Sequence, residues 1–257
     1  MLSTHAGGGQ LPRRWRYDAV RHRRTGPYVI GLPDHGRKVS LRDDRMLARL
    51  AIVDPALTDD CPRKVTFASG LDALTQVIEP FVSTRATPFT DVLIRPAIPL
   101  GINALMQLMR HEDAQARDDL AWVSLCGGLA LANSGLGAVH GLAGVIGGMT
   151  PAAHGAICGA LLGPILQINR ARTTGAAQAR LTEVCEILAV ALGTTPANAP
   201  KALQHWAAAS GLPGLRAQRL QLRDYAAVAE AALASSSMKT NPAMLSKADL
   251  QAVLGET

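Results

Sequence analysis

Apolar residues recur at helical spacing over most of the chain. Leu71, Leu74 and Ile78 lie three or four positions apart, which places their side chains on one helix face, so a helix is predicted over residues 70–82. Similar patterns predict helices over residues 88–109, 113–145 (one long helix or two joined), 152–170, 182–192, 200–210 and 225–234, and a short one after residue 246. The pattern therefore predicts an all-helical domain over residues 63–257.

Particular residues indicate where some of these helices begin or break. Thr87 is a candidate N-cap, and Ser246 is another whose side-chain oxygen can reach the amide of Asp249. Pro96 and Pro99 fall inside the stretch 88–109, where interior prolines kink or break a helix.

The first sixty residues carry a different pattern. Tyr28–Leu32 and Lys38–Leu41 are short runs on either side of a turn signal, and both are predicted strands. Leu50–Val53 is an apolar run stopped by an Asp-Pro pair, which predicts a buried strand. Residues 28–62 are therefore expected to form a few strands and loops. Residues 1–27 show no periodicity and are expected to be a poorly ordered, arginine-rich extension.

Composition favours a packed helical core, and the charge is local. Hydrophobic residues make up 48% of the 257 residues, charged residues 18% and aromatic residues only 4%. The net charge is +6, and six arginines lie between Arg13 and Arg24, so the rest of the chain is nearly neutral. Trp15 and Tyr17 are interleaved with them, so nucleic-acid binding is an alternative to a solvated extension. The solvated extension is the favoured interpretation, and no nucleic-acid partner is expected.

The cysteines and the apolar stretches bear on the compartment. Four cysteines (Cys61, Cys126, Cys158 and Cys185) show no CxxC pairing, so no disulfide framework is predicted. Residues 1–10 lack the apolar run of a signal peptide, and the longest apolar stretches contain glycines and a histidine. These stretches are interpreted as buried helices rather than membrane spans, and a cytoplasmic location is expected.

Four polar residues in apolar surroundings are candidates for a metal site. Asp72 and Gln76 lie four positions apart on one predicted helix, so they share a face. His140 is placed near the end of a later helix, and His154 in the first turn of the next one, so a chain reversal could bring the imidazoles together. One carboxylate and two imidazoles with an open position suit Zn²⁺ or Fe²⁺. The alternative is that each histidine is a hydrogen-bonded core residue and that Asp72 lies near an N-cap, while Gln76 alone indicates nothing.

Glycine is unusually frequent over residues 126–148, a stretch otherwise predicted to be helical. Each helical glycine costs roughly 1 kcal/mol relative to alanine, so a cluster of them indicates that another backbone or a ligand approaches closely.

Several of these segments resemble a known family. Residues 70–79, 133–141 and 154–155 are similar to the metal-binding segments of the iron-containing (group III) alcohol dehydrogenases. Residues 51–58 resemble the strand and turn before the family's helical domain, and residues 241–242 with 245–254 resemble its C-terminus. The resemblance runs in order over about residues 36–257. It implies a dehydroquinate-synthase-like fold, in which a nucleotide-binding α/β domain precedes a helical metal-binding domain.

The resemblance also implies an activity and a ligand set. The family interconverts alcohols and aldehydes or ketones with NAD(P), and its metal acts as a Lewis acid on the substrate oxygen. Asp72, His140 and His154 match three of its four ligand positions, which implies Fe²⁺ or Zn²⁺ here. Homodimers are common in the family, so a homodimer is expected.

The sequence departs from the family in three respects. Gln76 stands at the ligand position that is usually histidine, and an amide oxygen is a weaker, harder ligand than imidazole. The remaining Asp-His-His set is similar to the zinc site of the related glycerol dehydrogenases. Gly144 stands where many relatives carry another histidine in the active site. Family members are longer at the N-terminus, so residues 28–62 are expected to be a remnant of an α/β domain whose dinucleotide-binding part is largely missing.

Two functions therefore stay open. The first is a metal-dependent, NAD(P)-linked oxidoreductase acting on a small alcohol or aldehyde. The alternative is a catalytically inactive, truncated helical module that retains metal or partner binding.

Overall fold

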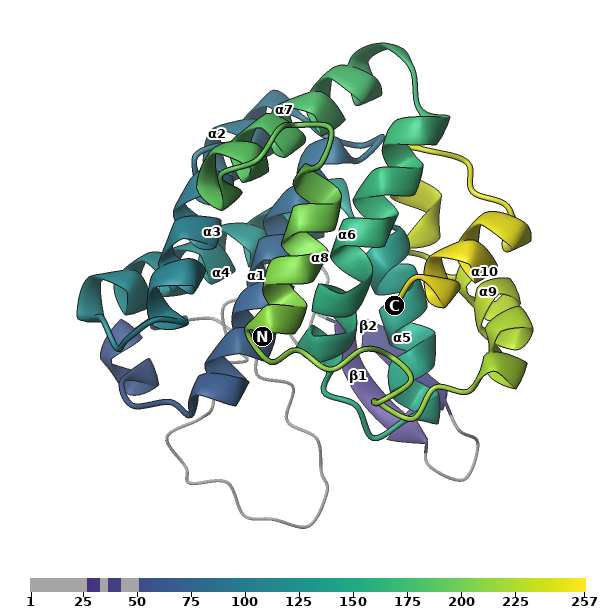
Figure 1. Ribbon diagram of the computed structural model, residues 1–257, viewed down its shortest axis with the longest axis horizontal. Helices are drawn as coiled ribbons and strands as arrows, with labels where there is room; N and C mark the ends of the chain where they lie inside the picture. Colours follow the sequence, from purple (N-terminus) through teal and green to yellow (C-terminus); the bar gives the residue numbers. More distant parts are fainter. Residues whose placement is uncertain (1–26, 33–36, 43–50) are drawn as a thin grey trace.

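The computed structural model describes residues 27–32, 37–42 and 51–257, and within these ranges the protein is mainly α-helical (Figure 1). The α-helices are α1 (Arg63–Val82), α2 (Pro88–Ile94), α3 (Ala97–Leu108), α4 (Ala114–Ser134), α5 (Ala138–Met149), α6 (His154–Arg172), α7 (Gly175–Leu192), α8 (Ala199–Ala209), α9 (Tyr225–Leu233) and α10 (Lys247–Gly255). Short 3₁₀ helices lie at η4 (Pro55–Thr58), η5 (Leu222–Asp224) and η6 (Met238–Thr240). The predicted helical character of residues 63–257 is confirmed.

Helix α1 is the central element of the fold. It contacts α3 and α4 on one side and α6 on another, and Figure 1 shows it between these helices. Every residue from Gly70 to Val82 is buried, including the polar Asp72, Thr75, Gln76 and Glu79. A helix buried on all sides has no solvent face for its polar side chains, so these residues must find partners inside the protein.

The predicted caps and the break at Pro96 are confirmed, whereas Pro99 does not break a helix. Thr87 caps α2 in a reciprocal arrangement with Thr90, and Ser246 caps α10 in the same way with Asp249. The stretch 88–109 is two helices, because α2 ends before Pro96 and α3 begins after it. Pro99 lies in the first turn of α3, where its missing N–H group has no intrahelical partner to lose.

The long stretch 113–145 is also two helices. Helix α4 ends at Ser134, and the following Gly135 has φ of 76°, a backbone conformation that favours glycine. Helix α5 then departs at an angle of 101° to α4. This break is what brings the first turn of α5 against α1.

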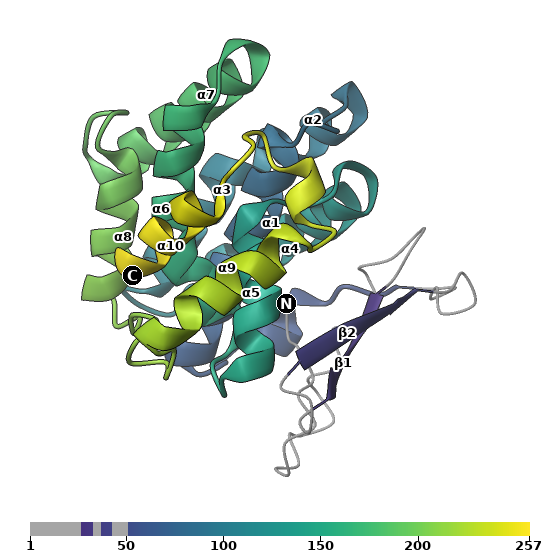
Figure 2. The same cartoon turned by 90° about the vertical axis from the view of Figure 1, so that its right-hand side faces the viewer.

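The two described strands form one antiparallel hairpin. Strand β1 (Pro27–Leu32) pairs with β2 (Arg37–Arg42), so that Pro27 faces Arg42 and Leu32 faces Arg37. Strand β2 contacts α5, and Figure 2 shows the hairpin at the edge of the helical body, away from α7 and α8. Both predicted strands before residue 42 are confirmed.

Two expectations for the N-terminal part are wrong. The described residues Ala51–Val53 form no strand, and Ile52 is 74% exposed, so the predicted buried strand over residues 50–53 is not present there. A short apolar run forms a buried strand only where a neighbouring strand and a covering layer accept it, and here Asp54 instead caps η4. The main helix begins at Arg63, seven residues earlier than predicted. The arginine-rich segment lies outside the described residues.

One described stretch could cross a membrane by length and composition alone. It is Pro88–Leu108, and 44% of its apolar window is buried inside the protein. The bent α4–α5 pair passes the same test only if it is counted as one broken span. Core helices of water-soluble proteins also pass it, so this is weak evidence for a membrane span.

Candidate metal centre

Asp72, His140 and His154 meet inside the helical body. Asp72 lies in the middle of α1 and is 0% exposed, so it is not an N-terminal cap. Its Oδ1 atom lies 3.4 Å from Nε2 of His140 and 3.8 Å from Nε2 of His154. The two imidazole centroids are 5.5 Å apart. The structure therefore brings together three of the four residues that the sequence indicated as candidates.

Chain length explains how two histidines fourteen positions apart become neighbours. His140 was predicted near the C-terminal end of a helix but lies in the first turn of α5. His154 is the first residue of α6. The nine steps from His140 to Met149 advance about 14 Å along α5. The five steps of the following non-helical segment can span a similar distance back, because an extended residue covers about 3.3 Å. The starts of both helices thus lie beside Asp72.

Two glycines let neighbouring helices approach α1 closely. A Cβ atom at Gly155 would lie 2.0 Å from the carbonyl oxygen of Ala68 and 3.1 Å from Cβ of Asp72. A Cβ atom at Gly127 of α4 would lie 2.9 Å from Cβ of Gln76. Any larger residue at position 155 would push the start of α6, and His154 with it, away from Asp72. The glycine-rich stretch 126–148 indeed includes a position of close backbone approach.

Glu79 fixes the orientation of His140. Its Oε2 atom lies 2.6 Å from Nδ1 of His140, and its Oε1 atom accepts a hydrogen bond of 2.7 Å from the backbone N–H of Val139. The backbone N–H of Ala138, the first residue of α5, donates a hydrogen bond to Oδ1 of Asn241. A carboxylate at a helix N-terminus is stabilised by the helix dipole. Because Glu79 holds Nδ1, Nε2 of His140 is directed at Asp72.

The electrostatics of the metal-free cluster follow from these contacts. Burial disfavours a charge on Asp72, but the contact with His140 and the charge of nearby His154 together outweigh it, so the pKa of Asp72 lies well below its ordinary value. Burial also disfavours a charge on His140, but its contacts with Asp72 and Glu79 raise the pKa of His140 to about 9. At neutral pH His140 is therefore protonated beside the Asp72 carboxylate, and a metal ion must displace the proton on Nε2.

Sequence reasoning missed two residues at this site. Glu79 lies seven positions after Asp72 and three after Gln76, so helical spacing already put all three on one face of α1. Cys158 lies one turn after His154 on α6, and its Sγ atom is 3.7 Å from Nε2 of His154. One donor atom from each of Asp72, His140, His154 and Cys158 lies within 4.8 Å of every other. These four residues are called the donor cluster below.

The donor cluster fits a tetrahedral metal ion. Bonds of about 2.0–2.3 Å to O, N and S ligands give ligand–ligand separations of about 3.3–3.8 Å in a tetrahedron. Three of the six pairwise separations, 3.4, 3.8 and 3.7 Å, lie in that range, and the other three are at most 4.8 Å. A carboxylate, imidazoles and a thiol are all established ligand types for zinc. The donor set and its spacing therefore suit a divalent transition metal.

Comparison with known proteins decides the family. Residues 66–257 match the C-terminal part of the Fe-containing alcohol dehydrogenase family. The chain belongs to this family. The matched range contains the whole donor cluster together with Gln76 and Glu79.

Individual relatives agree with this assignment. Alcohol dehydrogenase 4 of Saccharomyces cerevisiae is 31% identical over 231 residues, which are 88% of this chain and 59% of the yeast protein. Long-chain-alcohol dehydrogenase 1 of Geobacillus thermodenitrificans is 45% identical over 113 residues, which are 44% of this chain and 29% of that protein. The crystal structure of a 1,3-propanediol oxidoreductase superposes with a TM-score of 0.79 at 27% identity, covering 93% of this chain and 63% of that one. The described helices therefore form the C-terminal helical domain of the iron-containing alcohol dehydrogenase fold, and the chain spans less than two thirds of these relatives.

The departures from the family pattern can now be located in the structure. Gln76 is buried on α1 one turn after Asp72, and its Cβ packs against α4 at Gly127. Gly144 is exposed on α5, and a Cβ atom there would meet no atom within 4 Å. There is therefore room for a side chain at position 144 in this family member, but glycine leaves that space empty.

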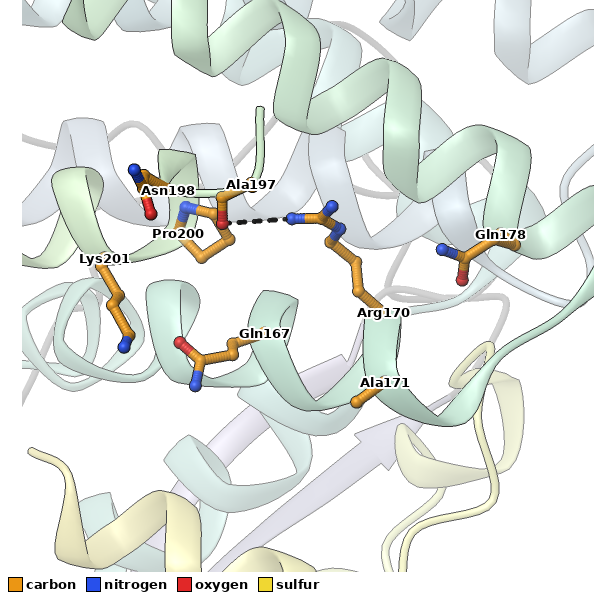
Figure 3. Close-up of a pocket in the computed structure, with 8 residues that line it drawn as sticks. All are labelled: Gln167, Arg170, Ala171, Gln178, Ala197, Asn198, Pro200 and Lys201. Atoms are coloured by element: carbon orange, nitrogen blue, oxygen red, sulfur yellow. Dashed lines mark hydrogen bonds between the residues drawn. The ribbon is translucent and has the colours of Figure 1, made fainter. Parts of the chain in front are cut away.

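A separate pocket lies away from the donor cluster. Figure 3 shows it between α6 and the start of α8, lined by Gln167, Arg170, Ala171, Gln178, Ala197, Asn198, Pro200 and Lys201. Arg170 donates to the carbonyl oxygens of Pro196 and Ala197, so it serves to hold the loop before α8. Gln167 is nine residues beyond Cys158 on α6, a distance of about 14 Å along the helix. This pocket is therefore not part of the candidate metal centre.

Proposed function

We propose that the chain is the metal-binding part of an oxidoreductase that interconverts alcohols with aldehydes or ketones and uses NAD(P). The observation that carries this proposal is the meeting of Asp72, His140 and His154 inside the matched family region, at separations that suit one metal ion. The relatives named above are called dehydrogenases or oxidoreductases of alcohols, which supports the reaction class.

Each residue has a defined part in this proposal. Asp72, His140 and His154 would hold Fe²⁺ or Zn²⁺, and Gln76 would contribute its amide oxygen as a ligand or as a partner of the ligands. When bound, the metal supplies Lewis-acid chemistry toward a substrate oxygen. Glu79 positions His140 and keeps Nε2 directed at the ion, as outer carboxylates do in other metal sites. The side chain of His154 is 17% exposed while that of Asp72 is 0% exposed, so the donor cluster is open to solvent on the side of His154, where a substrate would approach.

The partners are part of the same proposal. NAD(P) follows from the family resemblance, although the described residues contain little of a nucleotide-binding domain. The substrate is an alcohol or aldehyde, the expected assembly is a homodimer, and the expected location is the cytoplasm. Neither a membrane nor a nucleic acid has a role in this proposal. Light scattering on the purified chain measures the assembly directly.

Metal analysis of the purified full chain tests the proposal. After removal of all metal and dialysis against Zn²⁺ or Fe²⁺, the wild type is expected to retain about one ion per chain. His140→Ala and Asp72→Asn are expected to retain almost none, because each removes a ligand. His205→Ala is the matched control, since His205 is exposed on α8 and is not part of the donor cluster, and it should bind like the wild type. Equal, negligible metal in all four proteins overturns the proposal.

The alternative function is a helical module that binds metal or a partner without turnover. It is favoured by the match to the C-terminal part of the family alone. Titration with NADH, followed by fluorescence, separates the two functions. Saturable binding together with alcohol-dependent turnover supports the oxidoreductase, whereas metal binding without either supports the module.

A further inference from the structure

The thiol of Cys158 lies at the metal centre, where the family pattern places no ligand. Helix α6 carries His154 and Cys158 four positions apart, so both side chains lie on the face turned to α1. The Sγ atom of Cys158 is 3.7 Å from Nε2 of His154 and within 4.8 Å of donor atoms of Asp72 and His140. The separation of the thiol from His154 is thus that of two corners of a metal tetrahedron, and its separations from Asp72 and His140 are at most 4.8 Å.

The other cysteines show that this placement is specific to Cys158. Cys61, Cys126 and Cys185 are buried free thiols, as Cys158 is. Of these four cysteines, all within the described residues, only Cys158 lies in a group of side chains that could hold a metal ion. The four cysteines therefore share burial, and proximity to metal-binding donors sets Cys158 apart.

The departure at position 76 gives this thiol a role. Gln76 offers a weak amide oxygen where the family resemblance expects an imidazole, and it sits on α1. Cys158 approaches the same three ligands from α6. We propose that Cys158 is a fourth protein ligand of the metal, so that this chain's centre is Asp72–His140–His154–Cys158. This inference rests on the proposed metal-binding function.

The proposed ligand set has chemical consequences. Metal binding releases the thiol proton to solvent, and the resulting thiolate forms one bond to the ion. A thiolate is a soft ligand, so the set favours Zn²⁺ or Co²⁺ over the hard cations Mg²⁺ and Mn²⁺. Four protein ligands would also leave a tetrahedral site without an open position.

Titration of the metal-free full chain with Co²⁺ tests the assignment. The wild type is expected to develop an intense thiolate-to-cobalt charge-transfer band in the near ultraviolet. Cys158→Ser and Cys158→Ala should lose that band and bind Zn²⁺ at least about tenfold more weakly, since even changes beside metal ligands cost about that much. Cys126→Ala and Cys185→Ala, also at buried thiols, should keep both properties.

X-ray absorption of the zinc-loaded wild type gives a second readout that needs no variant. One sulfur neighbour at about 2.3 Å is expected in addition to the nitrogen and oxygen ligands. Metal binding that depends on His140 but shows no sulfur neighbour and no charge-transfer band overturns the role of Cys158 and leaves the proposed function standing. A wild type that binds no metal overturns both.

Discussion

Two polar clusters lie beside α1 and serve different purposes, and each contains a buried charged side chain, Arg117 in one and Asp72 in the other. Near the N-terminal end of α1, Arg117 donates to both carboxylate oxygens of Glu112, to the hydroxyl of Thr66 and to the carbonyl of Cys61. Six residues after Thr66 on α1, at Asp72, the donor cluster brings together lone pairs of oxygen, nitrogen and sulfur. In the first cluster each guanidinium nitrogen of Arg117 donates a hydrogen bond to an oxygen, so the cluster needs no bound ion.

The difference between them lies in what converges. An arginine fork and a carboxylate neutralise one another, and the result stabilises a helix junction. Atoms that all offer electron pairs gather favourably only around a proton or a metal ion. Burial of polar groups alone therefore does not identify a functional site in this fold. A group of converging atoms that all offer electron pairs does.

The largest effect is expected from Gly155→Ala, which drives a Cβ atom into the carbonyl of Ala68 at 2.0 Å. Backbone cannot yield as a flexible side chain does, so the free energy of unfolding should fall by about 3 kcal/mol, and metal binding should weaken as His154 moves. Urea denaturation and zinc titration measure the two effects. Gly144→Ala is the control, because its Cβ meets open space, and it should gain up to about 1 kcal/mol. Equal stability of the two variants contradicts the packing argument.

Arg117→Met separates the two clusters. It removes the hydrogen bonds of a guanidinium whose side chain is only 5% exposed, so the free energy of unfolding should fall by about 2 kcal/mol. Zinc affinity should stay unchanged because the donor cluster is untouched. Lys247→Met, which breaks a more exposed ion pair with Glu230, should cost less than about 1 kcal/mol. Loss of zinc affinity in Arg117→Met contradicts the independence of the two clusters.

Glu79→Gln should lower zinc affinity and leave the fold intact, which is the reverse of the effect expected for Arg117→Met. An amide holds the imidazole of His140 less firmly than a carboxylate does, so zinc affinity should fall by about 10- to 100-fold while the helical content is retained. Competition with a chelator measures the affinity. Glu183→Gln, on α7 and away from the cluster, serves as the matched control. Unchanged affinity in Glu79→Gln shows that this carboxylate does not position a ligand.

The smallest expected effect concerns the stability of the metal-free chain in mild alkali. The folded-state pKa of His140, about 9, is above its ordinary value of 6.5. The stabilisation from its protonated form is therefore complete below about pH 6.5 and is lost as pH rises through about 9. Thermal unfolding across this window should show a decline that is absent in His140→Gln. If both proteins show the same dependence of thermal stability on pH, protonated His140 does not stabilise the fold.

Helices and caps were largely predictable from the sequence, because they depend on neighbours a few positions away. The spacing around Leu74, the cap at Thr87 and the break at Pro96 each determine structure locally. The run before Asp54 was mispredicted for the opposite reason. Whether such a run becomes a buried strand depends on distant partners that a local pattern does not contain.

The candidate site shows the same division. Asp72, His140 and His154 could be proposed from spacing and resemblance, and the structure brings them together. Cys158 resembled an ordinary core cysteine until its Sγ atom was placed beside His154. Glu79 shared the helix face of Asp72, but its bond to a residue 61 positions away depends on the packing of α5 against α1.

Anomalous X-ray diffraction from a zinc-loaded crystal of the full chain tests the central claim most directly. The predicted result is one strong anomalous peak within bonding distance of the Asp72 carboxylate and the Nε2 atoms of His140 and His154. A zinc-loaded crystal with no peak at that position, or with its peak only at surface residues, would contradict the account.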